Sequence, residues 1–185
     1  VQATTAMFRE LYGFEPVPED YLPFVGMGAV RYTEGPAEKY GVTIDTPKAV
    51  LRRTENMIQM MEHWDESIAF AGVHTLLDAA FERDDWKVAI ATSTPQDLAE
   101  ATLKAARIPM ERVAAFVHGD MVVHKKPHPE IFEKAAQALS LPPGQCVGVE
   151  DSPPGVEALN AAGIASVAVT HTFTREQLSH ARLIV

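Results

Sequence analysis

The sequence predicts an α/β fold, with a parallel sheet covered by helices on both faces and a small helical domain before it. Three observations lead to this fold class. The first part of the chain has apolar residues at helical spacing and no convincing strand, whereas from about residue 69 short apolar runs alternate with helical segments. These runs are nearly continuous, which is typical of strands buried on both faces. We therefore expect a helical domain at residues 1–68 and an α/β domain at residues 69–185.

The helical domain is predicted from the spacing of its apolar side chains. Ala3, Met7 and Leu11 recur every four residues and place one apolar face on a first helix. A second helix is expected to begin with Thr46 as its N-cap and Pro47 at its first position. Its apolar side is expected to carry Val50, Leu51, Met57, Ile58 and Met61.

The α/β domain is predicted to alternate strands and helices along the chain. The expected strands are 88–91, 113–117, 146–149, 166–169 and 183–185. The expected helices are 73–83, 95–106, 129–139, 153–162 and 175–181. In an open parallel sheet, ligands bind at the carboxyl ends of the strands, so the residues that follow each strand are the candidates for a site.

Composition limits the classes of function. The 25 acidic and 16 basic side chains give a net charge of −9, which argues against a nucleic-acid surface. A small phosphorylated substrate is still compatible, because a bound metal ion reverses the local field. No apolar run reaches the length of about 18 residues that a membrane span needs. The single cysteine, Cys146, indicates a reducing compartment, and we expect a cytoplasmic monomer or weak homodimer.

Three groups of polar residues follow predicted strands. Thr92 and Ser93 lie between a strand and a helix, where hydroxyls and free backbone N–H groups bind anions. Lys126 precedes Pro127 in a loop and offers a compact cation for a phosphoryl group. Glu150 and Asp151 end a buried strand and offer the hard oxygen ligands that suit Mg²⁺.

Each group also has a structural interpretation when it is taken alone. Hydroxyl residues at a helix start are ordinary caps, and a lysine in a loop is usually solvated. Either Asp151 or Ser152 can cap the helix that begins at Pro153. Because Ser152 can cap that helix by itself, the acidic pair can still bind a metal ion.

As a set, the three groups resemble the motifs of the haloacid dehalogenase-like hydrolase superfamily, in its phosphatase and β-phosphoglucomutase branch with a helical cap. The second motif of the family is similar to the segment ending in Thr92-Ser93, which implies that Thr92 binds phosphate through its hydroxyl. The third is similar to Lys126-Pro127, with Lys126 neutralising the phosphate and the nucleophile. The fourth is similar to Val149-Glu150-Asp151-Ser152, which implies a Mg²⁺ site at the acidic pair.

The first motif of that family has no counterpart in the 185 residues. It is a strand that ends in Asp-x-Asp, and its first aspartate attacks phosphorus to form an aspartyl phosphate. The resemblance implies that this strand lies upstream of Val1 and sits between the strands that carry Thr92 and Glu150. An empty position there would expose unpaired backbone groups and apolar faces.

The resemblance also implies a function. The loop at Gly26 is similar to the cap loop over the family's active site, and Arg31 lies two places after Ala29, the nearest match to an arginine that holds a distal phosphate. We expect Gly26 and Arg31 to contact substrate in a Mg²⁺-dependent phosphatase that acts on a small metabolite such as a sugar phosphate. The alternatives are a β-phosphoglucomutase-like phosphomutase and, if the protein begins at Val1, a catalytically inactive module that binds phosphate and metal.

Overall fold

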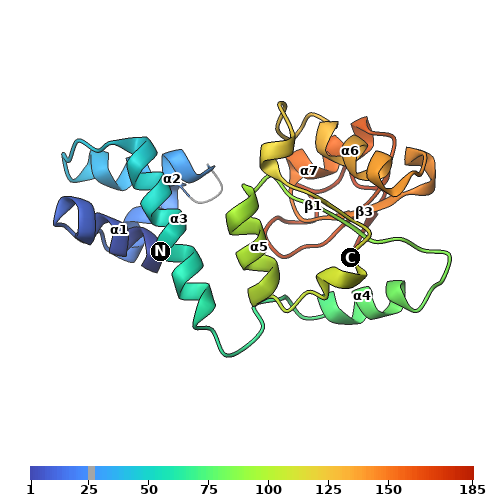
Figure 1. The fold of residues 1–185 in the computed structure, drawn as a ribbon. Coiled ribbons are helices and arrows are strands. Elements are labelled where there is room, and N and C mark those ends of the chain that lie inside the picture. The colour runs from blue at the N-terminus through green and yellow to red at the C-terminus, as the bar shows by residue number, and fades with distance from the viewer. Residues whose placement is uncertain (25–27) are drawn as a thin grey trace. The chain divides into compact units, whose positions relative to one another are not determined.

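The computed structural model describes residues 1–24 and 28–185 and divides the chain into two compact units, Val1–Ser67 and Ile68–Val185 (Figure 1). This division falls one residue before the boundary expected from the sequence pattern. Each unit has its own hydrophobic core, and each is described separately. Among the described residues, no helix has the length and apolar character to cross a membrane.

The N-terminal unit is helical. Helix α1 packs against α3, and α2 packs against both α3 and the 3₁₀ helix η1. The core of the unit is formed by Met7, Phe8, Tyr21, Ala37 and Ala49. The elements are α1 (Gln2–Tyr12), η1 (Pro18–Phe24), α2 (Gly28–Lys39) and α3 (Thr46–Glu62).

Two features of this unit differ from the sequence prediction. Asp45, not Thr46, is the N-cap of α3, because its carboxylate accepts the backbone N–H of Lys48 at 3.1 Å. Helix α2 was not predicted, since it contains Gly35 and a proline, which are poor helix formers. The ring of Phe24 lies against the α-carbon of Gly35, where a Cβ would come within 2.1 Å of a ring atom, so packing with η1 compensates for the low propensity.

The C-terminal unit follows the predicted alternation of helices and strands. Three short 3₁₀ helices, η2 (Met110–Arg112), η3 (Gly119–Met121) and η4 (Pro143–Gln145), lie in its loops. Its strands are β1 (Ala89–Ala91), β2 (Ala115–Val117), β3 (Val147–Glu150), β4 (Ala165–Ala168) and β5 (Leu183–Ile184). Its helices are α4 (Val73–Phe81), α5 (Gln96–Ala105), α6 (Glu130–Leu139) and α7 (Pro153–Ala161).

The helix expected at residues 175–181 is wrong. This segment forms successive turns, in which Leu178 N–H donates to Thr174 O at 3.1 Å and Ala181 N–H donates to Leu178 O at 2.9 Å. Thr174 and Gln177 exchange side-chain and backbone hydrogen bonds as they would at a helix start. The segment makes only turns before β5 begins. Leu178 is its buried residue, in a small core with Val156 and Ala168, and Ala181 packs against the same core while partly buried.

The strands form two parallel sheets. In one, β1 pairs with β2 from Ala89↔Ala115 to Ala91↔Val117, and in the other β3, β4 and β5 pair in that order. Strands β1 and β3 are not paired with each other, so an open position separates the two sheets. Val147 and Val149 on β3 are 68% and 49% exposed, which is unusual for valine in a parallel sheet.

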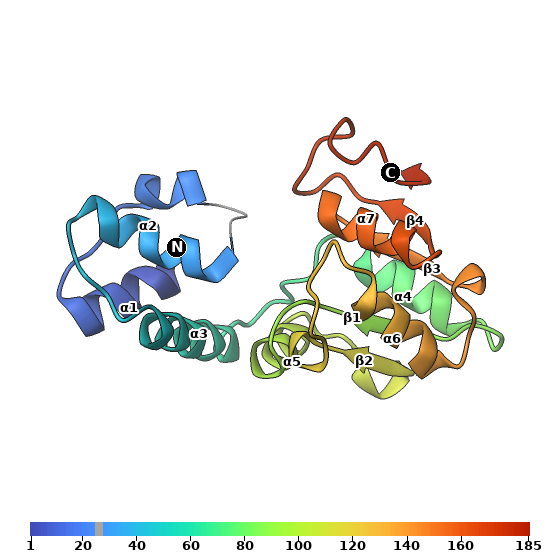
Figure 2. The same cartoon turned by 90° about the horizontal axis from the view of Figure 1, so that it is seen from above.

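Helices hold the two sheets together on one side. Helix α6 contacts β1 and β2, α7 contacts β3 and β4, and α6 also contacts α7. The principal core of the unit lies under these helices and includes Val117, Ile131, Leu159 and Ile164. Helix α4 lies on the opposite side of the strands (Figures 1 and 2) and buries none of its side chains, although its residues are mainly apolar.

Candidate functional site

Thr92 lies at the carboxyl end of β1. Its N–H donates to Val117 O at 2.9 Å, which extends the β1–β2 pairing by one residue. Its hydroxyl accepts the N–H of Thr94 at 3.2 Å and forms a tight turn before α5. Ser93 is exposed at the tip of this turn. Thr92 and Ser93 therefore form a turn with free polar groups at a helix start, as an anion site requires.

The loop after β2 holds this turn in place. Gly119 N–H donates to Thr94 O at 2.8 Å, and a Cβ on Gly119 would lie 2.3 Å from Ser93 O. The carboxylate of Asp120 accepts the N–H of Gln96 in the first turn of α5 at 2.7 Å. The residues after β2 thus cap α5 and fix the Thr92 turn against their own backbone.

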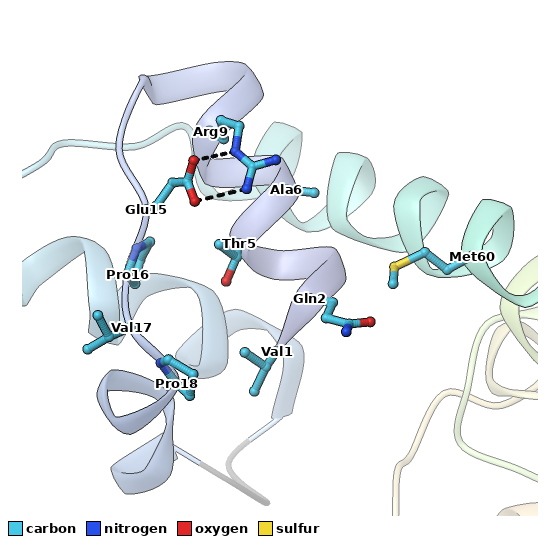
Figure 3. A pocket seen from close by; sticks show the side chains of 10 residues that line it. All are labelled: Val1, Gln2, Thr5, Ala6, Arg9, Glu15, Pro16, Val17, Pro18 and Met60. Atoms are coloured by element: carbon cyan, nitrogen blue, oxygen red, sulfur yellow. Dashed lines mark hydrogen bonds and ion pairs between the residues drawn. The ribbon is translucent and has the colours of Figure 1, made fainter.

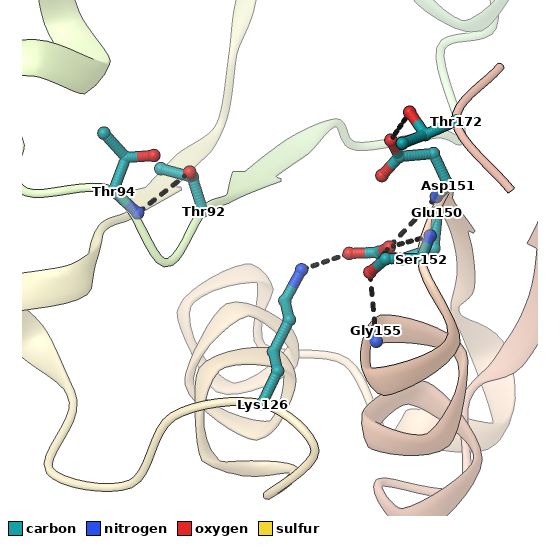
Figure 4. Close-up of polar contacts among 8 residues, drawn as sticks. All are labelled: Thr92, Thr94, Lys126, Glu150, Asp151, Ser152, Gly155 and Thr172. Atoms are coloured by element: carbon teal, nitrogen blue, oxygen red, sulfur yellow. Dashed lines mark hydrogen bonds and ion pairs between the residues drawn. The ribbon is translucent and has the colours of Figure 1, made fainter. Parts of the chain in front are cut away.

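Lys126 extends from the loop before α6 toward the end of β3 (Figure 4). Its ammonium forms an ion pair with Glu150 Oε1 and lies 4.8 Å from the centroid of the Phe132 ring. The Lys126 side chain is 16% exposed and that of Glu150 is 8% exposed. Lys126 is therefore an oriented and largely buried cation, and not a solvated loop residue.

Glu150 is held by several donors. Its Oε2 accepts the N–H of Asp151 at 3.0 Å, and the N–H and hydroxyl of Ser152 at 3.0 and 2.8 Å. A Cβ on Gly155 would lie 2.0 Å from Glu150 Cδ, so the carboxylate uses space that only a glycine leaves. Burial raises the pKa of Glu150, but the Lys126 ammonium and the Ser152 hydrogen bonds outweigh burial and lower it overall.

Asp151 is the freer of the two acids. Its Oδ2 accepts the hydroxyl of Thr172 at 2.9 Å, and its side chain is half-buried. Ser152 caps α7 by accepting Gly155 N–H at 3.2 Å, so Asp151 is not needed for capping. Asp151 thus keeps a carboxylate oxygen available for a hard cation.

The structure brings four of the predicted residues to one edge of the unit. Thr92 directly follows β1, Glu150 is the last residue of β3, and Asp151 follows it (Figure 4). The Lys126 ammonium pairs with Glu150, and the open position between the two sheets lies between β1 and β3. In the part of the chain that is described, no three His, Cys, Asp or Glu side chains gather closely enough to hold a metal ion. The role of the acidic pair as metal ligands therefore stays a prediction.

Two predicted substrate contacts belong to the other unit. Gly26 lies outside the described residues. Arg31 is in α2, where its guanidinium donates to Glu38 at 2.8 Å and to Glu34 at 3.4 Å and lies 5.4 Å from the Phe24 ring centroid. These carboxylates already neutralise Arg31, so its contact with substrate stays a prediction.

A pocket of about 550 Å³ lies within the N-terminal unit (Figure 3). Arg9 and Glu15 pair at its wall, with Arg9 Nη2 donating to Glu15 Oε2 at 2.8 Å. The remaining lining is mainly small and apolar, with Val1, Ala6, Pro16, Val17, Pro18 and Met60, and it also includes Gln2 and Thr5. Because the two charges neutralise each other, this lining presents few polar groups to orient a ligand.

Sequence reasoning missed two residues of the site in the C-terminal unit. Phe132 supplies the ring beneath Lys126, and Thr172 binds Asp151. Thr172 comes from the segment after β4, where the carboxyl-end rule applies as well. Gly155, three residues after the capping Ser152, belongs to the sequence pattern of the fourth motif and leaves room for Glu150.

Comparison with known proteins assigns the chain to a family. The model of the haloacid dehalogenase-like hydrolase family matches residues 2–163. The chain belongs to the haloacid dehalogenase-like hydrolases. The match includes Thr92, Lys126, Glu150 and Asp151, so the family and its α/β fold are those expected from the motifs.

Relatives of this hydrolase include proteins of known name. The chain is 32% identical to SUPPRESSOR OF QUENCHING 1, chloroplastic, of Arabidopsis thaliana over 97% of its own residues and 17% of that protein. It is 42% identical to the phosphorylated carbohydrates phosphatase of Thermotoga maritima over 44% of the chain and 37% of that protein. The chain spans about half or less of the length of the curated relatives it matches first.

A solved structure shows the same fold. A variant of CbbY from Rhodobacter sphaeroides, in complex with xylulose-(1,5)bisphosphate, superposes with a TM-score of 0.78 and 24% identity. The comparison covers 100% of this hydrolase and 84% of the CbbY chain. The arrangement of helices and strands is therefore the one shared by this family.

Proposed function

We propose that the protein is a Mg²⁺-dependent phosphatase that acts on a small phosphorylated metabolite, such as a sugar phosphate. The observation that carries the proposal is the ion pair of Lys126 with Glu150, which lies at the same edge of the unit as Thr92 (Figure 4). The relative from Thermotoga maritima is named as a phosphatase of phosphorylated carbohydrates, and CbbY holds a sugar bisphosphate, which supports this substrate class.

Lys126 and Thr92 are the proposed phosphate-binding residues. A phosphoryl group is a dianion, and its approach to any anionic nucleophile is opposed by charge repulsion. The Lys126 ammonium is aligned by Glu150 and Phe132, so it can offset this charge without reorganising during the reaction. The hydroxyl of Thr92 and the exposed Ser93 turn would donate hydrogen bonds to phosphoryl oxygens.

Asp151 is the proposed protein ligand of Mg²⁺. Mg²⁺ takes oxygen ligands and is commonly bound by one or two carboxylates together with the substrate phosphate and water, so an incomplete acidic pair fits it. When bound, the ion would neutralise phosphoryl charge and orient the substrate. Thr172 orients Asp151 for this role. Glu150 supports the site here by aligning Lys126, and its predicted role as a second metal ligand stays a prediction.

A carboxylate nucleophile is proposed to come from outside the 185 residues. Among the described residues, β1 pairs only with β2 and β3 pairs only with β4, while Val147 and Val149 on β3 are 68% and 49% exposed. Helix α4 buries none of its residues. A parallel strand there would end between Thr92 and Asp151. Its carboxylate oxygen would attack phosphorus as the bond from phosphorus to the leaving alcohol breaks, and water would then hydrolyse the acyl phosphate.

A phosphatase is favoured over a phosphomutase by the state of Arg31. A mutase needs an available cation for a second phosphate, whereas Arg31 is neutralised by Glu38 and Glu34. We propose that the N-terminal unit acts as the helical cap that selects the substrate, with Gly26 and Arg31 as its predicted contacts.

The test is phosphate release by the full-length protein from a panel of sugar phosphates. Activity is expected with Mg²⁺ and should be abolished by EDTA and restored by added Mg²⁺. Activation by a sugar bisphosphate with product isomerisation would instead indicate a mutase. Absence of phosphate release from every ester, with phosphate still bound, would indicate an inactive binding module.

A further inference from the structure

The loop that carries Lys126 has few regular backbone contacts of its own. It runs from the end of η3 to the start of α6 and contains no strand or helix. Backbone N–H groups in such a loop need partners if the loop is to keep one conformation. Two of them, Val123 N–H and His124 N–H, donate to the two carboxylate oxygens of Glu130, at 3.1 and 2.8 Å. One side chain thus holds two consecutive amides.

Glu130 is itself well fixed. It is the first residue of α6, its side chain is 15% exposed, and the ammonium of Lys134 lies 3.2 Å from its Oε1. Lys134 also donates to Met121 O at the other end of the same loop. The N–H groups of His124 and Val123, aided by Lys134, lower the pKa of Glu130 to about 2, so the carboxylate is ionised at neutral pH.

Lys126 lies within the ring that these contacts close. It comes two residues after His124 and four before Glu130, and its ammonium lies over Phe132, two residues farther along α6. The first turn of α6 therefore holds Lys126 at two points: Glu130 binds the backbone before it, and Phe132 packs against its ammonium. A shift of the backbone at residues 123–124 would therefore also shift the backbone of Lys126, which lies two residues farther along the chain.

We propose that Glu130 is a positioning residue that holds the Lys126 loop so that the ammonium reaches Glu150 at the end of β3. This inference rests on the proposed function for its catalytic consequence, but its structural part does not. The carboxylate acts by accepting two backbone N–H groups, and it does not contact the Lys126 ammonium. The Glu130 carboxylate at the start of α6 thus positions Lys126 through the backbone of the loop.

The experiment uses Glu130→Ala and Glu130→Gln in the full-length protein, with Glu133→Gln as the matched control. Glu133 lies in the same turn of α6, is exposed, and loses the same charge. Glutamine keeps an oxygen that accepts one N–H, so it should partly rescue the effect of alanine. Three quantities are measured: hydrogen exchange at Val123 and His124, the stability coupling between Lys126 and Glu150, and kcat and KM.

In Glu130→Ala, we expect exchange at Val123 and His124 to be at least about tenfold faster, because both acceptors are lost. The coupling of Lys126→Met with Glu150→Gln, measured by a double-mutant cycle, should fall by at least about half. With the phosphate ester, kcat should fall by about 10–100-fold, a larger change than that in KM. Glu130→Gln should lie between alanine and wild type, and Glu133→Gln should match wild type in all three.

Two results would overturn the proposal. One is unchanged exchange at Val123 and His124 in Glu130→Ala. The other is faster exchange with an unchanged Lys126–Glu150 coupling, which would show that the loop amides do not set the position of Lys126. If the full-length wild type released no phosphate, the proposed function would fail, while exchange and coupling would still decide the role of Glu130.

Discussion

The ammonium of Lys126 and the carboxylate of Glu150 form an ion pair that joins the loop before α6 to the carboxyl end of β3. Because both side chains are largely buried, removing either one leaves the other without its counter-charge.

Removing the ammonium should destabilise the protein. In Lys126→Met, Glu150 keeps the N–H groups of Asp151 and Ser152 but loses its counter-charge, so we expect a loss of roughly 1–3 kcal/mol, between the values for exposed and buried pairs. Urea unfolding measures this loss. Lys104→Met, at an exposed position on α5, should change stability by less than about 0.5 kcal/mol. An equal effect of both variants would mean that the pair contributes nothing specific.

Gly155→Ala should be destabilising although alanine favours helices. The added Cβ would overlap the carboxylate of Glu150, whose Cδ would be 2.0 Å away, and we expect a cost of about 1–3 kcal/mol. Gly144→Ala is the control, because a Cβ there meets nothing within 4 Å. Thermal unfolding distinguishes the two, and a Gly155→Ala protein as stable as Gly144→Ala would show that Glu150 does not occupy this space.

Acid should remove stability through two carboxylates. The pKa of Glu130 is lowered to about 2 by its backbone donors, and that of Glu150 is lowered by Lys126 and Ser152 despite burial. A lowered folded-state pKa contributes stability above the ordinary value of 4.5, which is lost as pH falls toward the folded value. Urea midpoints between about pH 6 and 2.5 should therefore fall less steeply for Glu130→Gln than for wild type. Parallel curves would contradict this assignment.

Thr92→Val should impair catalysis more than stability. Valine keeps the β-branched shape but removes the hydroxyl that accepts Thr94 N–H and is proposed to bind phosphate. We expect kcat/KM to fall by about tenfold or more, with recovery in Thr92→Ser, which retains the hydroxyl. Steady-state kinetics measures both. If Thr92→Val kept the wild-type kcat/KM, Thr92 would not bind the phosphoryl group.

The open position between β1 and β3 predicts a difference in hydrogen exchange. If a further strand fills it in the full-length protein, amides of β3 that do not bond to β4 should be protected there and exposed in the 185-residue chain. Strand β4 is the control, because it is paired on both sides and should be protected in both proteins. Equal exchange of the β3 amides in the two proteins would contradict the added strand.

Much of the site could be predicted because parallel strands bring their carboxyl ends together. This rule selected Thr92, Glu150 and Asp151 from residues that lie far apart in the sequence. The rule does not predict which of the two carboxylates, Glu150 or Asp151, is left available to bind a ligand. Glu150 is engaged by Lys126 and Ser152, whereas Asp151 contacts Thr172, and this difference depends on side-chain directions at the β3–α7 turn.

The remaining differences arise from tertiary contacts that override local preference. Helix α2 forms despite Gly35 because Phe24 packs against it. Residues 175–181 form turns despite a helical pattern, with Leu178 buried in a small core and Ala181 packed against it. The role of Glu130 depends on a loop that folds back onto α6, so a glutamate at a helix start gave no sign of it.

The most direct test of the central claim is the kcat/KM of Lys126→Met for a sugar phosphate in the presence of Mg²⁺. Phosphoryl transfer at the edge where Thr92, Lys126 and Asp151 meet predicts a loss of about 100-fold or more relative to wild type, with Lys104→Met unaffected. A Lys126→Met protein that is folded and retains wild-type kcat/KM would show that the reaction does not take place at this site.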